Sequence, residues 1–320
     1  MTFSLPAPLE GATPLSHLGV IRVEGEDAAH FLHGQLTQDF ALLGLQHARL
    51  AGFLSAKGRM QASFIGFKRA AAAGGTEVLL ICSRDLLPAT LKRLSMFVLR
   101  AKARLTDATA DFALYGLAGS AAEALLADAA EPWAKRDLEG GAAVVRLYPA
   151  AGQARALWVA PSGTPAPAGS ALEPALWLWS EVQSGVATLT TPVMDAFVPQ
   201  MLNYESVGGV NFKKGCYPGQ EVVARSQFRG TLKRRTYLAH LPEATAEAAA
   251  TGTEVFAQAD AEQPVGTVVQ SATAPNGGVD ALLSLQIASA TPEAGLRVGN
   301  SAEGPAVTLL SLPYALLEDI

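Results

Sequence analysis

The hydrophobic pattern of the chain changes near residue 242, and this change constrains the fold more than any other feature of the sequence. Before it, segments typical of strands alternate with segments of helical spacing. After it, short strand patterns recur between Gly, Pro and Asn turns. No Gly-x-Gly-x-x-Gly fingerprint occurs, which favours an α+β fold over a doubly wound sheet. We therefore predict one α+β unit over 1–110, a second over 111–241 and a C-terminal β-barrel over 242–320.

Apolar spacing within the first two units predicts short strands and helices. Strands are predicted at 18–23, 49–54, 59–67, 77–82, 101–106, 112–117, 142–147 and 156–160. Helices are predicted from a cap at 25–27 to about Leu36, from Ser83 to Val98, over 120–130 and around 172–183. On the last of these, Leu176 and Trp179 share an apolar face from which Trp177 points away. That position is typical of packing at a rim or an interface.

One loop places a thiol among basic residues. Residues 212–221 read Phe-Lys-Lys-Gly-Cys-Tyr-Pro-Gly-Gln-Glu, and a helix is predicted to begin directly afterwards. Neighbouring lysines and a helix N-terminus favour thiolate over thiol, so we expect Cys216 to be more nucleophilic than a free cysteine. The alternative interpretation is a tight turn, beneath which a small cysteine merely packs.

The same region is strongly basic. Residues 213–235 hold seven Lys and Arg and one Glu, a net charge of +6 on a chain whose total is −5. A basic segment on an acidic protein indicates a focused anion site, and we expect Lys213, Lys214 and Arg225 to stabilise a Cys216 thiolate. The alternative is a solvated helix face and strand end.

Cysteine and histidine usage predicts neither a disulfide framework nor a metal site. The two cysteines, Cys82 and Cys216, are too few for either, and Cys82 ends a predicted buried strand as an inert core thiol. His30 and His33 lie three apart on one predicted helix, where they could share a metal, but a polar helix face is the favoured interpretation. Asp39 closes this helix in a capping or turn role.

The sequence predicts a cytoplasmic protein without a membrane span. Residues 1–6 lack the basic and apolar regions of a signal peptide, and no run approaches 18 apolar residues. The Walker, Gly-x-Ser-x-Gly and His-Glu-x-x-His motifs are also absent from the sequence, so the common nucleotide-binding, serine-hydrolase and zinc-protease classes have no support.

Segments spread over nearly the whole chain carry a family resemblance. They are residues 27–39, 56–60, 197–203, 212–221 and 312–314, in that order. Together they resemble the YgfZ family of folate-binding proteins, bacterial relatives of a mitochondrial iron–sulfur assembly factor. The resemblance implies a fold like that of the glycine-cleavage T-protein, a tetrahydrofolate-dependent aminomethyltransferase. In that fold two α+β units enclose a central folate channel, which a C-terminal β-barrel closes.

The resemblance also implies a function. Members of the family maintain or repair iron–sulfur enzymes, including enzymes that thiolate tRNA, with a reduced folate as ligand. Cys216 matches the cysteine that is functionally critical in the family. The expected cofactor is tetrahydrofolate or a derivative, and the expected partners are iron–sulfur client enzymes or assembly proteins. The candidate folate-binding residues are Trp177, Gln183, Lys214, Gly215, Tyr217, Gln220 and Arg225.

Two positions depart from the family pattern. Some relatives have a binding-site tryptophan in the first strand, and this chain has Leu18 at the matching position. Gln183 stands where several folate-binding relatives carry a carboxylate. A neutral amide offers the pterin N–H donors only one acceptor, a change expected to cost about 1–3 kcal/mol of binding free energy.

Two other functions remain open. A one-carbon transferase requires a carboxylate beside the reacting nitrogen of the substrate and N5 of the folate, and no residue can be assigned to that role, so enzymatic activity is left open. Direct tRNA binding through 213–235 is the least favoured interpretation, because the rest of the chain is acidic.

Overall fold

The computed structural model describes residues 9–71, 74–126, 129–299 and 304–317. Residues 1–6, which were predicted to lack a signal peptide, and part of the helix predicted over 120–130 lie outside the described residues. Among the helices that the structure describes, none is both long enough and apolar enough to cross a membrane.

The first of three antiparallel sheets confirms the early strand predictions. Its strand order is β3-β4-β5-β2-β6. The strands are β2 (Leu18–Glu24), β3 (Ala48–Leu54), β4 (Met60–Ala70), β5 (Thr76–Ser83) and β6 (Arg104–Asp107). The strand predicted at 101–106 begins later, at β6. The backbone around Lys102 instead turns to meet Asp27, whose carboxylate accepts the Lys102 N–H at 2.8 Å.

The second sheet combines the N-terminal strand with strands from the middle of the chain. Its order is β1-β7-β10-β9-β8. The strands are β1 (Gly11–Pro14), β7 (Phe112–Ala118), β8 (Lys135–Asp137), β9 (Ala143–Arg146) and β10 (Arg155–Pro161). The pairing of β1 with β7 was not predicted, because β1 has only four residues and its partner lies about a hundred residues away.

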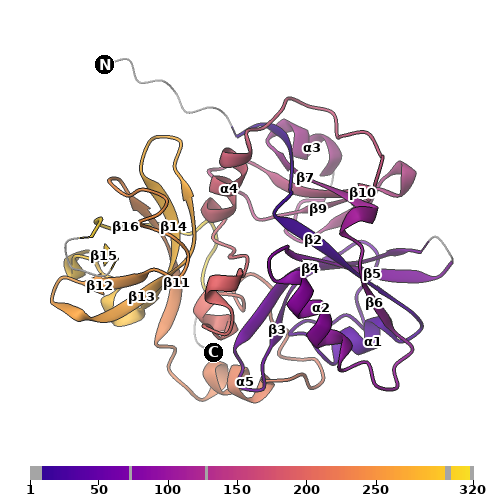
Figure 1. The fold of residues 1–320 in the computed structure, drawn as a ribbon, viewed down its shortest axis with the longest axis horizontal. Helices are drawn as coiled ribbons and strands as arrows, with labels where there is room; N and C mark the ends of the chain where they lie inside the picture. Colours follow the sequence, from indigo (N-terminus) through magenta and orange to yellow (C-terminus); the bar gives the residue numbers. More distant parts are fainter. Residues whose placement is uncertain (1–8, 72–73, 127–128, 300–303, 318–320) are drawn as a thin grey trace.

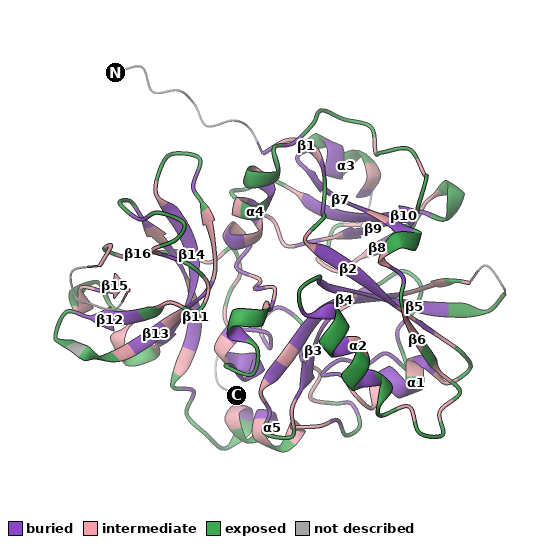
Figure 2. Cartoon of the chain, viewed as in Figure 1, coloured by how far each residue is buried: buried purple, intermediate pink, exposed green. Residues whose placement is uncertain are grey.

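The two five-stranded sheets share one core, and helices cover their other faces (Figures 1 and 2). Alternate residues of β5 enter different cores: Leu79 and Ile81 pack between the sheets, whereas Leu80 packs beneath α1 and α2. Burial on both faces explains the unbroken apolar run of this strand. The helices of this part are α1 (Ala28–His33), α2 (Leu87–Ser95) and α3 (Ser120–Leu126).

Local polar contacts make α1 and α2 shorter than predicted. The helix predicted to reach Leu36 ends as α1 at His33, and Asp27 bonds to Lys102 rather than capping it. The helix predicted from Ser83 begins only at Leu87. The hydroxyl of Ser83 donates to Asp85 at 2.6 Å, and Asp85 also accepts the N–H of Thr191, which holds this segment in a turn.

The C-terminal part forms a six-stranded antiparallel sheet, drawn in orange and yellow in Figure 1. Its order is β15-β12-β13-β14-β11-β16. The strands are β11 (Arg234–Leu241), β12 (Glu254–Ala257), β13 (Asp260–Thr273), β14 (Val279–Gln286), β15 (Arg297–Val298) and β16 (Thr308–Leu310). A bridge between Arg297 and Ala306 brings its edges together. The closed barrel, the two-unit arrangement and the three domain ranges stay predictions.

Two helices and a largely irregular segment link the sheets. Helix α4 (Pro174–Gln183) packs against the C-terminal sheet and also contributes to the core between the other two sheets (Figure 1). Helix α5 (Gln220–Phe228) follows the cysteine loop, as predicted. Short 3₁₀ helices occur at Thr109–Asp111, Glu139–Gly141, Thr191–Val193, Pro199–Leu202, Ile287–Ser289 and Pro292–Ala294.

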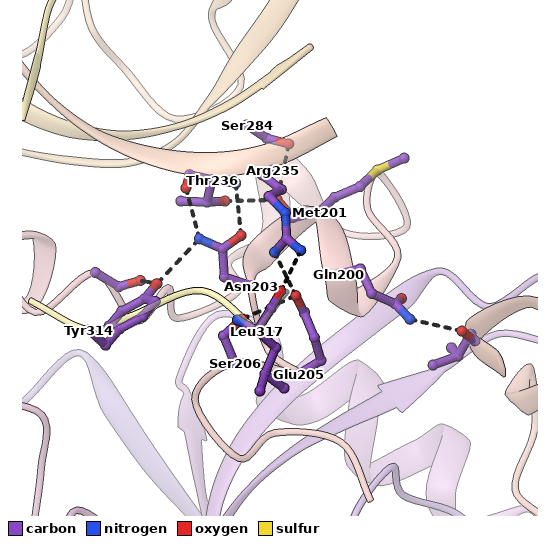
Figure 3. A network of polar contacts seen from close by, with 12 residues as sticks. Gln200, Met201, Asn203, Glu205, Ser206, Arg235, Thr236, Ser284, Tyr314 and Leu317 are labelled. Carbon is purple, nitrogen blue, oxygen red and sulfur yellow. Dashed lines mark hydrogen bonds and ion pairs between the residues drawn. The ribbon is translucent and has the colours of Figure 1, made fainter. Parts of the chain in front are cut away.

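A buried polar network joins this segment to the C-terminal sheet (Figure 3). The amide of Asn203 donates to the carbonyl of Thr236 at 2.8 Å and accepts its N–H at 3.2 Å. Tyr314 donates to the carbonyl of Gly185 at 2.7 Å. The amide of Asn203 also donates to the hydroxyl of Tyr314 at 3.4 Å, so the network connects two of the segments that carry the family resemblance, 197–203 and 312–314.

Asn203 is expected to be a stability determinant. It has a φ of 57°, in the left-handed region, and its amide is buried. Asn203→Ala is expected to lower the free energy of unfolding by about 2 kcal/mol, for two reasons. It removes the amide that pairs with two backbone groups of Thr236, and it puts alanine, which tolerates the left-handed region less well than asparagine, at a left-handed position. Urea unfolding measures this loss. Asn203→Gly relieves the backbone strain alone and should recover about 1 kcal/mol, and equal losses would contradict this account.

Candidate functional site

A cavity lies at the core between the two five-stranded sheets. Its apolar wall includes Leu18 of β2, Ile81 of β5 and Leu157 of β10. Trp177 and Glu181 of α4 enter the same cavity, as does Arg155 of β10. The cavity therefore combines an aromatic surface with two charged groups inside an apolar core.

Trp177 forms a buried surface of this cavity, which corrects the prediction of rim or interface packing. Its side chain is 1 % exposed. A Cβ on Gly116 of β7 would lie 2.5 Å from the indole ring, so the ring packs directly on the strand backbone. The guanidinium of Arg155 lies 4.4 Å from the ring centroid. The helical pattern was misleading because α4 is covered on two sides, by the central core and by the C-terminal sheet.

Glu181 supplies a largely buried carboxylate, with 12% of its side chain exposed, that was not predicted from the sequence. It accepts the indole N–H of Trp177 at 2.8 Å and pairs with Nε2 of His17 at 3.0 Å. Burial alone would raise the pKa of Glu181, but His17, Arg155 and Trp177 together outweigh burial and hold the pKa below its ordinary value. Glu181 is therefore an anion inside the core. The available sequence signal was its position four residues after Trp177 on one helix.

Arg155 is the counterpart cation. Burial lowers its pKa to about 10, so it stays protonated at neutral pH. Its Nε has no hydrogen-bond partner among the residues that the structure describes. A buried donor without a partner is costly, which suits a site that presents polar atoms to a ligand. Arg155, Glu181 and Trp177 together would fit a flat heteroaromatic ring that carries both hydrogen-bond donors and acceptors.

The pairing of His17 with Glu181 predicts a pH-dependent stability. Burial would lower the pKa of His17, but the bond and attraction to Glu181 raise it above its ordinary 6.5. The contribution of His17 to the free energy of unfolding is therefore fully present below pH 6.5, and it is lost as the pH rises through the pKa of His17 in the folded protein. The lowered pKa of Glu181 makes its contribution full above pH 4.5.

Stability should consequently depend on this pair most strongly between about pH 4.5 and 6.5. The difference in unfolding free energy between wild type and His17→Gln is expected to be largest near pH 5.5, at about 1 kcal/mol or less because His17 is partly exposed. It should shrink by pH 8. Urea unfolding at both pH values measures the difference, and an equal difference at both would contradict the pairing.

The two positions that depart from the family pattern lie in different environments. Leu18 lines the cavity. Gln183 does not, and its amide donates to Asp280 of β14 at 2.7 Å. The indole N–H of Trp179 donates to the same carboxylate at 2.6 Å. The carboxylate inside the cavity thus comes from Glu181, two positions before Gln183.

The cysteine loop forms a second group of candidate residues, because none of residues 212–221 lines the cavity. Lys214 anchors this loop to the end of α1. Its Nζ donates to the carbonyls of His33 at 2.5 Å and Leu36 at 3.0 Å, and it lies 4.5 Å from the ring centroid of Tyr217. Burial lowers the pKa of Lys214 to about 8. This lysine therefore holds the backbone in place.

The cysteine loop carries an exposed thiol. Cys216 is exposed, whereas Cys82 is buried and has a pKa raised by burial to about 12, as expected of an inert core thiol. Gly219 precedes Gln220 at the start of α5 with a φ of 77°. A Cβ at Gly219 would lie 2.6 Å from the carbonyl of Ser55, which explains the glycine and brings the loop against the segment 56–60.

The basic residues of 213–235 do not form one surface. Lys214 is buried, and Arg235 is buried against Glu205 at 2.7 Å. Arg234 donates to the carbonyl of Val265. On the exposed face of α5, Arg225 pairs with Glu221 at 2.9 Å. Part of the predicted anion-binding charge therefore serves internal contacts.

Comparison with known proteins places this architecture. The crystal structure of the glycine cleavage system aminomethyltransferase T from Bartonella henselae superposes with a TM-score of 0.67 at 18% sequence identity. The match covers 96% of this chain and 87% of that one. The protein therefore has the mixed α/β fold of the T-protein class.

Curated relatives refine the assignment. The tRNA-modifying protein YgfZ of Edwardsiella ictaluri is 32% identical over 317 residues, covering 92% of this chain and 89% of the relative. The protein of the same name from Yersinia enterocolitica is 29% identical and covers 95% of this chain and 92% of its own. No family model matches the chain. The chain belongs to the YgfZ family, which confirms the resemblance drawn from its sequence segments.

Proposed function

We propose that this protein binds a reduced folate, tetrahydrofolate or a derivative, with the pterin ring in the cavity at Trp177. The observation that carries the proposal is the ionised carboxylate of Glu181 and the guanidinium of Arg155, both buried beside one indole ring. The T-protein fold and the family membership support the same ligand class. Leu18 would form an apolar wall of the site, whereas roles in folate binding for Gln183, Lys214, Gly215, Tyr217, Gln220 and Arg225 stay predictions.

The donors and acceptors around the cavity fit a pterin. A pterin edge carries adjacent N–H groups, which a carboxylate such as Glu181 accepts with charge assistance. Arg155 has a buried Nε–H that lacks a partner among the described residues and could serve the carbonyl of such a ring. Trp177 would contact the ring through its aromatic surface. The folate, when bound, would supply a one-carbon carrier.

We further propose that the protein is a cytoplasmic accessory factor that maintains or repairs iron–sulfur enzymes, including enzymes that modify tRNA. The relatives named as tRNA-modifying proteins support this function. Cys216 is the proposed key residue, because it is an exposed thiol on a loop anchored by Lys214. Direct tRNA binding stays the least favoured mode, since Lys214 and Arg235 serve internal contacts.

Calorimetric titration with tetrahydrofolate and 5-formyltetrahydrofolate tests the ligand. Micromolar binding by wild type is expected, and it should weaken in Trp177→Phe, which keeps an aromatic ring but removes the N–H that Glu181 accepts. Trp179→Phe is the matched control on the same helix, because Trp179 bonds to Asp280 rather than Glu181. Absence of binding at millimolar folate would reject the ligand.

Complementation tests the cellular role. In a bacterium that lacks its own family member, wild type is expected to restore the activity of an iron–sulfur enzyme that thiolates tRNA, measured from the modified nucleoside. Cys216→Ser should fail to restore it, while Cys82→Ser should succeed, provided that both variants accumulate to the wild-type level. Full restoration by Cys216→Ser would reject the role of this thiol.

A one-carbon transferase is the second candidate function, favoured by the fold that the chain shares with an aminomethyltransferase. An assay of methylene transfer to tetrahydrofolate from an aminomethylated carrier protein decides between the two. Turnover lost in Glu181→Gln would favour the transferase, whereas folate binding without turnover would favour the accessory role.

A further inference from the structure

The cysteine loop packs against a histidine at the end of α1. A Cβ placed on Gly215 would meet Nε2 of His33 at 3.3 Å. Gly215 is not among the residues with positive φ, so its backbone conformation does not require glycine. The missing side chain instead lets the loop backbone approach Nε2 closely, at the residue next to the one that carries the thiol.

Asp39 orients this histidine. Its Oδ1 lies 3.0 Å from Nδ1 of His33 and also accepts the N–H of Leu42 at 2.9 Å. Burial would raise the pKa of Asp39, but the bonds from Leu42 and His33 outweigh it and hold the pKa below its ordinary value. An ionised Asp39 takes the proton on Nδ1 as its donor, which leaves Nε2 of a neutral His33 as a proton acceptor that faces the loop.

We propose that His33, oriented by Asp39, accepts the proton of the Cys216 thiol, so that the loop carries a Cys-His-Asp nucleophile. The proton moves from Sγ to Nε2, and Asp39 stabilises the imidazolium. The sulfur lone pair then forms a bond to an electrophilic carbon, whose leaving group departs with its electron pair. This inference rests on the proposed role of Cys216 and assigns its activation to named residues.

The surroundings are compatible with this transfer. Cys216 has no hydrogen-bond partner among the described residues, and contacts of this kind commonly tighten only once substrate is bound. The other charged or titratable groups around the pair are Lys214 beneath the loop, Lys213 within it, Lys68 near Asp39, and His30, whose ring stacks on His33 at 6.3 Å. The two lysines of the loop would favour the thiolate, in the same direction as His33.

The test is the rate of alkylation of Cys216 by iodoacetamide as a function of pH, followed by peptide mass spectrometry. The thioether forms at Sγ and iodide leaves. Cys82 is an internal reference, because it is buried and its pKa is about 12. The midpoint of the wild-type profile is expected at least about one unit below the 8.5 of a free thiol. His33→Asn should move the midpoint toward about 8.5 and lower the rate at pH 7 about tenfold.

The variants separate activation from folding. His33→Asn retains an amide N–H that can donate to Asp39 but has no group corresponding to Nε2, so the local structure is kept while the base is lost. Asp39→Asn is the second variant and should shift the midpoint in the same direction by a smaller amount. His30→Ala is the matched control on the same helix and should change the rate less than about twofold.

Each outcome bears on one claim. A free-thiol midpoint in wild type would overturn the reactive role proposed for Cys216, and this inference with it. A low midpoint that His33→Asn and Asp39→Asn leave unchanged would overturn the role of His33 alone and assign the activation to the lysines. A shift in both variants, without a shift in His30→Ala, supports the Cys-His-Asp arrangement.

Discussion

Replacing Arg235 with methionine is expected to lower the free energy of unfolding by about 3–5 kcal/mol. Arg235 donates to Glu205 at 2.7 Å, and their side chains are 9% and 0% exposed (Figure 3). Methionine keeps most of the aliphatic stem but leaves the carboxylate of Glu205 buried without this cation. A buried charge without its partner is strongly destabilising, so urea unfolding at pH 7 should show a large loss of unfolding free energy.

Two further variants isolate the cause. The double variant Arg235→Met with Glu205→Met removes both charges and should recover most of the lost stability. Arg225→Met removes the cation of an exposed pair of similar length, whose side chains are 70% and 85% exposed, and should unfold within error of wild type. Equal losses in Arg235→Met and Arg225→Met would show that burial of the first pair has no energetic consequence.

The second large effect concerns folate affinity. Glu181→Gln is expected to weaken binding of tetrahydrofolate by about 10- to 100-fold, or about 1.4–2.8 kcal/mol. Glutamine matches the shape of glutamate but has one acceptor oxygen in place of two and carries no charge. Its N–H groups would also face the pterin donors. Calorimetric titration of the variant against wild type at pH 7 measures the change.

Gln183→Ala is the matched control for this prediction. Gln183 lies two positions after Glu181, but its amide donates to Asp280 rather than lining the cavity. Its removal should leave folate affinity within about twofold of wild type. A loss at Gln183→Ala that equals or exceeds the loss at Glu181→Gln would place the ligand outside the cavity, against the C-terminal sheet.

Local sequence patterns were sufficient for most of the regular structure. The apolar run of β5 predicted a buried strand because both of its faces enter a core. The start of α5 followed from the glycine and proline that precede it. Helix ends were less predictable, as α1 and α2 show, because side chains such as Asp27 and Asp85 bond to distant backbone groups instead of extending a helix.

The candidate site was only partly predictable. The cysteine loop and Trp177 were identified from short segments and the family they resemble. Arg155 and Glu181 were not, because each is an ordinary residue of a strand or helix until the fold brings them together at Trp177. The rotation of α4 between two neighbours decided that Glu181, and not Gln183, enters the cavity.

The sequence by itself determined the family, the mixed α/β fold class, most strands and the position of the cysteine loop, because these follow from local spacing and short motifs. Only the tertiary structure decided what the charged residues do. Lys214 contacts the end of α1 about 180 positions earlier, and Arg235 meets a buried Glu205. His33 faces the loop of Cys216. Such contacts depend on how distant elements pack, and packing leaves no periodic signal in the sequence.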